Sequence, residues 1–260
     1  MREAQPAPPH LCCTVTMSKI ALVTGANRGL GLEIARQLGR SGVSVILSAR
    51  DASKASAAAS PLRKEGADVN AMQLDVTNVS SVRGAAEELR RDHGLLDILV
   101  NNAGILPEAT EHPQEAVDGA LFRQTFDTNL FGAVNVTEQL LPLLRESGSG
   151  RIVNVSTRMG SLCDQSDPNS VYYSTIVPAY QASKAALNCM TILLAKSLAG
   201  TRIKVNSVCP GFVQTDLTPI NREHAPFTAE DAANVVVRYA LIGDDGPTGG
   251  FFDREGTVAW

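Results

Sequence analysis

The chain of 260 residues is poor in cysteine and in aromatic residues, and it has no excess of positive charge. Its 5 cysteines include no Cys-x-x-Cys pair, which argues against a zinc site or a redox motif and favours reduced thiols. The net charge of −4 argues against a general affinity for nucleic acid or for an anionic membrane. No apolar run approaches the ~18 residues of a transmembrane helix. We therefore expect a cytoplasmic protein with no metal site and with neither nucleic acid nor membrane as a partner.

Residues 1–16 differ in character from the rest of the chain. They hold three prolines and one apolar patch that is too short and too poorly flanked for a signal peptide. We interpret them as a disordered N-terminal extension, with Met17 as the functional start. No linker divides residues 17–260, and α/β chains of ~200–250 residues often form one unit, so we expect a single domain there.

From Lys19 onward, short apolar runs alternate with segments of helical periodicity. Uninterrupted apolar runs are typical of strands that are covered on both faces, and Asp51 stands where a helix N-cap is expected. The alternation predicts an α/β fold, a Rossmann-type doubly wound parallel sheet of about seven strands with helices on both faces. The expected strands lie at 20–23, 43–48, 69–74, 96–100, 151–155, 202–208 and 249–252. The expected helices lie at 30–41, 51–66, 79–93, 115–147 and 179–199, with a last one that begins at 228.

A glycine-rich loop joins the first expected strand to the first expected helix. Glycines at these places allow a tight turn, a close approach of the backbone to a pyrophosphate, and packing of the helix on the strand. Free N–H groups at the start of the helix then face the anion. The loop therefore predicts a dinucleotide site, with a plain turn as the alternative. The residues concerned are Gly25, Asn27, Arg28, Gly29, Leu30 and Gly31.

The end of the second expected strand indicates which dinucleotide binds. An acidic residue there favours NAD because it bonds the ribose 2′-hydroxyl, and Asp51 is a candidate for that role. We instead expect Asp51 to cap the following helix. Arg50 is then placed for a 2′-phosphate, and Arg28 can reach the same group, so we predict NADP(H) as the cofactor. The alternative is that both arginines are solvated surface residues.

Four motifs occur in the order found in the short-chain dehydrogenase/reductase family, which the chain resembles from about Ser18 to Trp260. They are the glycine loop from Thr24 to Gly31, Asn101-Asn102-Ala103-Gly104, the Tyr180-x-x-x-Lys184 pair and Pro210-Gly211. Arg28, Ala49-Arg50, the stretch from Gly246 to Phe252 and the terminal Trp260 are similar to the carbonyl reductase branch.

The resemblance implies roles for further residues. Two of them match the position that contacts adenine, three match the segment that lines the cofactor beside the fourth strand, and four match the loop over the nicotinamide. Asn129 matches the helix asparagine that supports a water and the active-site lysine. Asp75 and Val76 match the adenine position, and Asn102, Ala103 and Gly104 match the segment beside the fourth strand. The residues that match the loop over the nicotinamide are Pro210, Gly211, Val213 and Thr215.

Tyr180 and Lys184 stand four residues apart on an expected helix, so their side chains share one face. Reduction of a carbonyl needs an acid that can become an anion, and a free tyrosine has a pKa of about 10. An ammonium ~4–5 Å away stabilises the phenolate by roughly 3–4 kcal/mol at an effective dielectric near 20. We therefore predict Tyr180 as the proton donor, with a lowered pKa and with Lys184 as its cationic partner. A surface contact is the alternative for an isolated pair.

The residue that bonds the substrate oxygen departs from the family pattern. The family has a serine after the fifth strand, and alignment of the strand and Gly160 puts Thr157 at that place. Thr157 keeps the hydroxyl, but its methyl group narrows the site. Ser156 is either a structural hydroxyl or the group that takes over, and we favour Thr157.

The stretch Ser161–Pro178 is longer than in the family's common form by about ten residues, and we expect a polar surface loop beside the pocket. This places the usual tetramer in doubt, so a homo-oligomer and a monomer both stay open. Asp216–Phe227 is expected to form a short lid over an open pocket. Candidate apolar wall residues are Leu106, Met159 and Phe212, with core packing as the alternative, and Tyr172 and Tyr173 either contact substrate or pack.

These expectations converge on NADPH-dependent reduction of a small-molecule ketone, aldehyde or quinone to an alcohol. An alcohol, steroid or sugar dehydrogenase of the same family is the first alternative. A non-catalytic NADP(H)-binding regulator is the second, although Tyr180, Lys184 and Asn129 argue against it because a sensor needs no proton donor.

Overall fold

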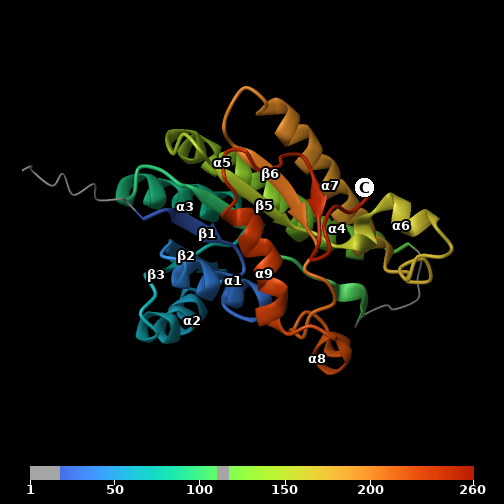
Figure 1. Ribbon diagram of the computed structural model, residues 1–260. Helices are drawn as coiled ribbons and strands as arrows, with labels where there is room; N and C mark the ends of the chain where they lie inside the picture. The colour runs from blue at the N-terminus through green and yellow to red at the C-terminus, as the bar shows by residue number, and fades with distance from the viewer. Residues whose placement is uncertain (1–17, 110–116) are drawn as a thin grey trace, which may run out of the picture.

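The computed structural model describes residues 18–109 and 117–260 (Figure 1). The expected extension at 1–16 lies outside the described residues. Over the described residues, seven parallel strands form one sheet in the order β3-β2-β1-β4-β5-β6-β7, which confirms the predicted fold class. The strands are β1 (Ile20–Val23), β2 (Ser44–Ala49), β3 (Val69–Gln73), β4 (Ile98–Asn101), β5 (Arg151–Val155), β6 (Lys204–Val208) and β7 (Phe251–Phe252).

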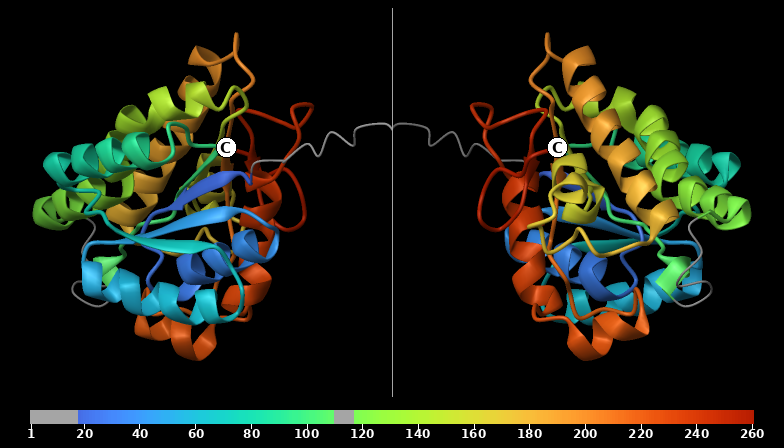
Figure 2. Two further views of the ribbon diagram at one scale, coloured as in Figure 1. Left: turned by 90° about the vertical axis from the view of Figure 1, so that its left-hand side faces the viewer. Right: turned by 90° about the vertical axis from the view of Figure 1, so that its right-hand side faces the viewer.

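Helices cover both faces of the sheet (Figure 2). One apolar cluster joins one face to α1, α2 and α9, and a second joins the other face to α3, α5 and α7. All residues of β2 and β5 are buried, as the uninterrupted apolar runs predict for strands between two helical layers. The helices are α1 (Gly29–Arg40), α2 (Ala52–Lys64), α3 (Val79–Asp92), α5 (Gly132–Glu146), α7 (Pro178–Ser197) and α9 (Ala229–Ala240).

Helices α2 and α9 begin at side-chain caps, and Asp51 is the cap that the sequence predicts. Asp51 accepts hydrogen bonds from the N–H groups of Ser53 and Lys54, at 2.8 and 3.2 Å, and thereby caps α2. Thr228 caps α9 through the N–H of Asp231. Each side chain satisfies donors that a helix leaves without an intrahelical acceptor.

Three elements differ from the sequence prediction. The single helix expected at 115–147 is interrupted, because a π-helical turn, η2 (Asp127–Phe131), separates α4 (Gly119–Phe126) from α5. The expected loop Ser161–Pro178 contains the short helix α6 (Leu162–Ser166), and the expected lid contains α8 (Pro219–His224). Helices of 5 and 6 residues carry too little periodicity to be recognised in a polar segment.

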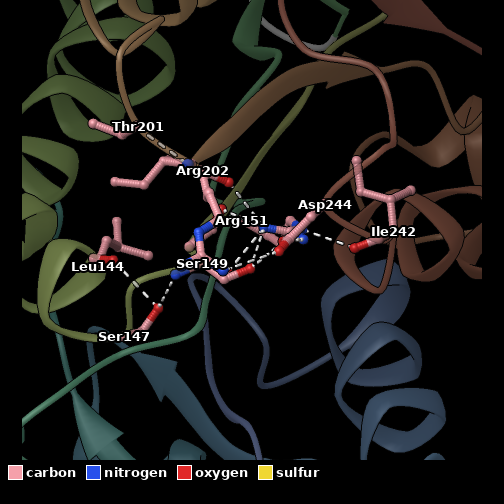
Figure 3. Close-up of polar contacts among 10 residues, drawn as sticks. Leu144, Ser147, Ser149, Arg151, Thr201, Arg202, Ile242 and Asp244 are labelled. Carbon is pink, nitrogen blue, oxygen red and sulfur yellow. Dashed lines mark hydrogen bonds and ion pairs between the residues drawn. The ribbon is translucent and has the colours of Figure 1, made fainter.

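The amino ends of the central strands are held together by Arg151, whose exposed fraction is only 2% (Figure 3). Its guanidinium donates to the backbone carbonyls of Ile242 at 2.8 Å and Arg202 at 3.2 Å. It also donates to Asp244 at 2.8 Å and to both oxygens of Ser149. This network connects the loops that enter β5 and β6 with the loop after α9, at the sheet edge opposite to the one considered next.

Candidate active site

A cleft of about 650 Å³ lies at the carboxyl ends of the strands. Every residue that the sequence predicts as catalytic or cofactor-binding lines it, except Asn129. Several other lining residues were not predicted, among them Ala49, Leu74, Thr77, Thr128, Thr175, Val177 and Cys209. In the described part of the chain, no helix has the length and apolar character needed to cross a membrane.

The glycine loop is packed against the turn after β4. Gly25 has a φ of +62°, and a Cβ there would lie 2.9 Å from the Cα of Ala103. A Cβ on Gly31 would lie 2.4 Å from the Nδ2 of Asn102. The Thr24 hydroxyl accepts hydrogen bonds from the N–H groups of Asn102 and Ala103, at 2.9 and 3.0 Å. The loop therefore has room only for glycine at two of its places.

The opening residues of α1, Gly29–Gly31, line the cleft. Arg28 occupies the N-cap position and offers no side-chain cap, and Gly29, with a φ of +55°, turns the chain into the helix. Uncapped N–H groups at a helix start form an anion site. The Arg28 side chain is 66% exposed and lies 3.8 Å from the Asp216 carboxylate of the lid segment.

At the end of β2, the neighbouring charged residues Arg50 and Asp51 have different surroundings. Arg50 is exposed and lines the cleft. The Asp51 carboxylate instead binds the first turn of α2, and its hydrogen bonds, chiefly from the Ser53 hydroxyl, hold its pKa below the ordinary value. This agrees with the expectation that Asp51 caps the helix. Beyond β3, the Asp75 carboxylate accepts from the N–H and the hydroxyl of Thr77.

Tyr180 and Lys184 are both buried at the floor of the cleft. The Nζ of Lys184 lies 5.8 Å from the centre of the Tyr180 ring and donates to the Val155 carbonyl at 2.8 Å. Burial lowers the pKa of Lys184 to about 8 and raises the pKa of Tyr180. This differs from the expected lowering for Tyr180: loss of hydration on burial is the main cause of its raised pKa, and the charge of Cys209 adds to it.

Asn129 lies beneath the cleft and does not line it. It sits in the π-helical turn η2, which is fully enclosed at this residue. Its side-chain oxygen accepts from the N–H of Ile105 at 2.8 Å, and its Nδ2 donates to the Ile105 carbonyl at 3.0 Å and to the Ser183 hydroxyl at 3.1 Å. Asn129 thus connects the chain after β4 with α7.

The two candidate hydroxyls after β5 have different surroundings. The Thr157 oxygen accepts a hydrogen bond from the N–H of Met159 at 3.2 Å, at the start of η3 (Arg158–Gly160), and its own proton remains available. The Ser156 hydroxyl is 3% exposed and has no hydrogen-bond partner among the described residues. Both residues line the cleft.

The segment 161–177 is held in place by Arg158. The guanidinium makes two hydrogen bonds of 2.9 Å to Asp164 and lies 5.5 Å from the centre of the Tyr172 ring. The Gln181 amide donates to Gln165 and to the Thr175 carbonyl. Tyr172 reaches the cleft, whereas Tyr173 does not line it.

Residues from three other turns line the cleft as well. Leu106 and Met159 contribute from the turns after β4 and β5, and Phe212, Leu217 and Ile220 contribute from the chain after β6. We call these residues, together with the cleft residues of 161–177, the substrate side. None of these described residues is charged, whereas Asp216, which lines the cleft beside Leu217, is paired with Arg28 and Arg222.

Comparison with known proteins assigns the chain to a family. Residues 19–225 match the family of short chain dehydrogenases. The chain belongs to this family. The resemblance predicted from its motifs is thereby confirmed, and the chain is an oxidoreductase with a carbonyl-reducing character.

Curated relatives and solved structures support the same assignment. The chain is 34% identical to salutaridine reductase of Papaver bracteatum, over 94% of this chain and 97% of the relative. It is also 34% identical to carbonyl reductase 3 of Rattus norvegicus, which is named as an NADPH enzyme, over 88% and 92% of the two chains. The structure of NADPH-bound carbonyl reductase from chicken fatty liver superposes with a TM-score of 0.80 at 25% identity, over 94% of this chain and 99% of that one.

Proposed function

We propose that the protein uses NADPH to reduce the carbonyl group of an uncharged small molecule to an alcohol, with Tyr180 as the proton donor. The observation that carries this proposal is the burial of Tyr180 and Lys184 together at the floor of the cleft, with the Thr157 hydroxyl on its wall. A buried phenol beside a buried ammonium suits proton transfer, because each controls the charge of the other.

The cofactor end of the cleft fits a dinucleotide. Side chains are excluded at Gly25 and Gly31, where a Cβ would clash, so the backbone can approach a pyrophosphate closely. Arg28 and Arg50 favour a 2′-phosphate, and the Asp51 carboxylate is occupied by α2. When bound, reduced nicotinamide supplies a hydride. The remaining residues proposed to hold the cofactor are Asn27, Gly29, Leu30, Asp75, Val76, Asn102, Ala103, Gly104, Tyr180, Lys184, Pro210, Gly211, Val213 and Thr215.

Side chains of the protein hold the proton and deliver it to the substrate oxygen. Burial keeps Tyr180 protonated, which is the form that reduction needs. With a pKa of about 8, Lys184 is mostly charged at neutral pH and stabilises the phenolate as the proton leaves Tyr180 for the substrate oxygen. The Thr157 hydroxyl donates a hydrogen bond to that oxygen, and Asn129 fixes the chain at Ile105 to Ser183, the residue before Lys184.

The substrate side favours a neutral ketone, aldehyde or quinone. Its described residues are uncharged and, apart from Tyr172 and Thr175, apolar, so a carboxylate or phosphate on the substrate would lose its hydration without gaining a cationic partner. Oxidation of an alcohol is the second candidate, because the relatives include a (+)-neomenthol dehydrogenase of Capsicum annuum at 31% identity. The raised pKa of Tyr180 favours reduction at neutral pH.

The test is consumption of NADPH, followed by its absorbance, with a panel of ketones, aldehydes and quinones. Tyr180→Phe is the matched variant, since it removes only the hydroxyl. We expect turnover by the native protein, a loss of at least about 100-fold in kcat for the variant, and unchanged NADPH binding. Binding of NADPH without turnover across the panel favours the regulator instead, and full activity of Tyr180→Phe contradicts the proposed proton donor.

A further inference from the structure

The helix that carries Tyr180 and Lys184 begins without a cap of its own. Its N-cap position holds Val177, whose side chain has no acceptor, and its first residue, Pro178, has no N–H group. The N–H of Gln181 is satisfied by the Val177 carbonyl at 2.9 Å. Two N–H groups of the first turn remain, those of Ala179 and Tyr180, and both are buried. Buried donors of this kind need an acceptor from elsewhere in the fold.

Glu108 supplies that acceptor from a distant part of the chain. Its carboxylate is only 4% exposed and accepts from the N–H of Ala179 through one oxygen and from the N–H of Tyr180 through the other, each at 2.8 Å. Glu108 lies in the short turn η1 (Pro107–Ala109), 71 residues before Ala179. No sequence motif marks it, although the uncapped start at Val177-Pro178 signals that an acceptor is required.

The peptide groups on both sides of Tyr180 are therefore held. Its N–H binds Glu108, and its carbonyl accepts from the Ser183 hydroxyl at 2.7 Å. The Ser183 hydroxyl in turn accepts from Asn129, which also holds Ile105, three residues before Glu108. Glu108 and Asn129 thus fix the same short segment after β4 to the first two turns of α7.

We propose that Glu108 is a positioning residue for Tyr180: its carboxylate holds the first turn of α7 so that the phenol faces the substrate carbonyl, and its negative charge offsets the positive end of the helix. The inference rests on the proposed role of Tyr180 as proton donor. Small errors in the placement of a reacting group are costly in rate, so a bond to the peptide of Tyr180 itself has a direct consequence for catalysis.

We expect the charge of Glu108 to bear on the proton of Tyr180 as well, because the carboxylate lies against the Tyr180 N–H. The titratable groups that face the phenol are Lys184 on its own helix, Cys209 at the end of β6, and Glu108 behind its backbone. A nearby anion opposes loss of a proton from Tyr180 and from Lys184 alike, and the helix end favours it. We therefore expect removal of the Glu108 charge to move the titration of both groups toward lower pH.

The experiment compares the full-length protein with Glu108→Gln and Glu108→Asp. Glu108→Gln keeps the size of the side chain but loses the charge and one of the two acceptors. Thr228→Ala is the control, because it removes a helix cap from α9, which contributes no residue to the cleft. For each protein we would measure kcat and KM for an accepted ketone, the Kd for NADPH, and the pH dependence of kcat.

For Glu108→Gln we expect a kcat about 10- to 100-fold lower, with the Kd for NADPH within about two-fold of the native value. The alkaline fall in kcat should move to lower pH. Glu108→Asp should retain the native pH dependence with a smaller loss of kcat, and Thr228→Ala should match the native protein in all four quantities. A merely structural role would lower stability without moving the pH dependence.

Results that contradict the inference about Glu108 differ from results that contradict the proposed function. Native turnover that is lost in Tyr180→Phe but retained, with unshifted pH dependence, in Glu108→Gln overturns the inference about Glu108 alone. Absence of turnover in the native protein, or full activity of Tyr180→Phe, overturns the proposed function. If Glu108→Gln does not fold, Glu108→Asp decides the matter: a lowered kcat with an unchanged Kd for NADPH supports the inference, and a kcat equal to that of Thr228→Ala contradicts it.

Discussion

The Nζ of Lys184 lies 5.8 Å from the centre of the Tyr180 ring, and among the described residues it donates to the Val155 carbonyl, at the end of β5. The ammonium is therefore anchored to the sheet rather than to the phenol. Burial disfavours the charge of both groups, so Tyr180 stays protonated and Lys184 loses its proton more easily than in water. The phenol of Tyr180 is therefore in the form that can donate a proton to a substrate oxygen.

The pKa of Lys184 predicts how reduction depends on pH. Since burial lowers this pKa to about 8, the ammonium loses its charge as the pH rises through that value. The phenolate that forms on Tyr180 then lacks its cation, so kcat for reduction should fall across the same range. Steady-state rates at saturating NADPH and ketone would show this. A rate that stays constant through pH 8 contradicts it.

The hydroxyl that binds the substrate oxygen can be identified by comparing Thr157→Ala with Ser156→Ala. Removal of a donor to a developing oxyanion typically costs about 100- to 1000-fold in kcat. We expect that loss for Thr157→Ala and a much smaller one for Ser156→Ala, since the Ser156 hydroxyl is enclosed without a partner. Thr157→Ser, which restores the hydroxyl, should recover most of the activity. A larger loss for Ser156→Ala would reverse the assignment.

Arg50 should carry much of the preference for NADPH over NADH. Replacement by alanine removes a charge-assisted hydrogen bond to the 2′-phosphate, worth roughly 1.5–3 kcal/mol, or about 10- to 100-fold in affinity. KM for NADPH should rise accordingly, with that for NADH unchanged. Arg83→Ala, on the exposed face of α3 outside the cleft, is the control. An equal rise in KM for NADPH and NADH would show that Arg50 does not bind the 2′-phosphate.

Arg151 should matter for stability and not for catalysis. Arg151→Met removes the donor to the Ile242 and Arg202 carbonyls and one of the donors to Asp244, so we expect a loss of about 3 kcal/mol in the free energy of unfolding, measured in urea. Turnover per folded molecule should be unchanged, because the network lies at the sheet edge opposite to the cleft. An unchanged urea midpoint would argue against the network as a stabilising element.

The same network predicts a loss of stability in acid. Hydrogen bonds from Ser149 and Arg151 lower the pKa of Asp244 to about 2 from 3.8. A lowered carboxyl pKa in the folded state contributes stability above the unfolded value, and this is lost as the pH falls from 3.8 through about 2. The Tm of the native protein should therefore fall more steeply over this range than that of Asp244→Asn. Parallel curves would contradict the prediction.

Much of the fold and of the cleft could be predicted because its signals are local. Alternating apolar runs identify the buried strands, and Asp51 caps α2 through residues two and three positions ahead. The glycine loop and the Tyr180-x-x-x-Lys184 pair are likewise short motifs. By contrast, the π-helical turn at Asn129 forms where its amide bonds both sides of Ile105, 24 residues away, which no local pattern reveals.

By itself, the amino-acid sequence determined the order of strands and helices, the place of the dinucleotide loop and the residue types available for proton transfer. Only the tertiary structure decided the charge states and the supports of those residues. Burial, which depends on the packing of α7 against the sheet, raised the pKa of Tyr180 where the sequence alone predicted a lower one. The acceptor for the Tyr180 N–H likewise came from Glu108, since a buried donor takes whatever acceptor the fold brings to it, at any separation along the chain.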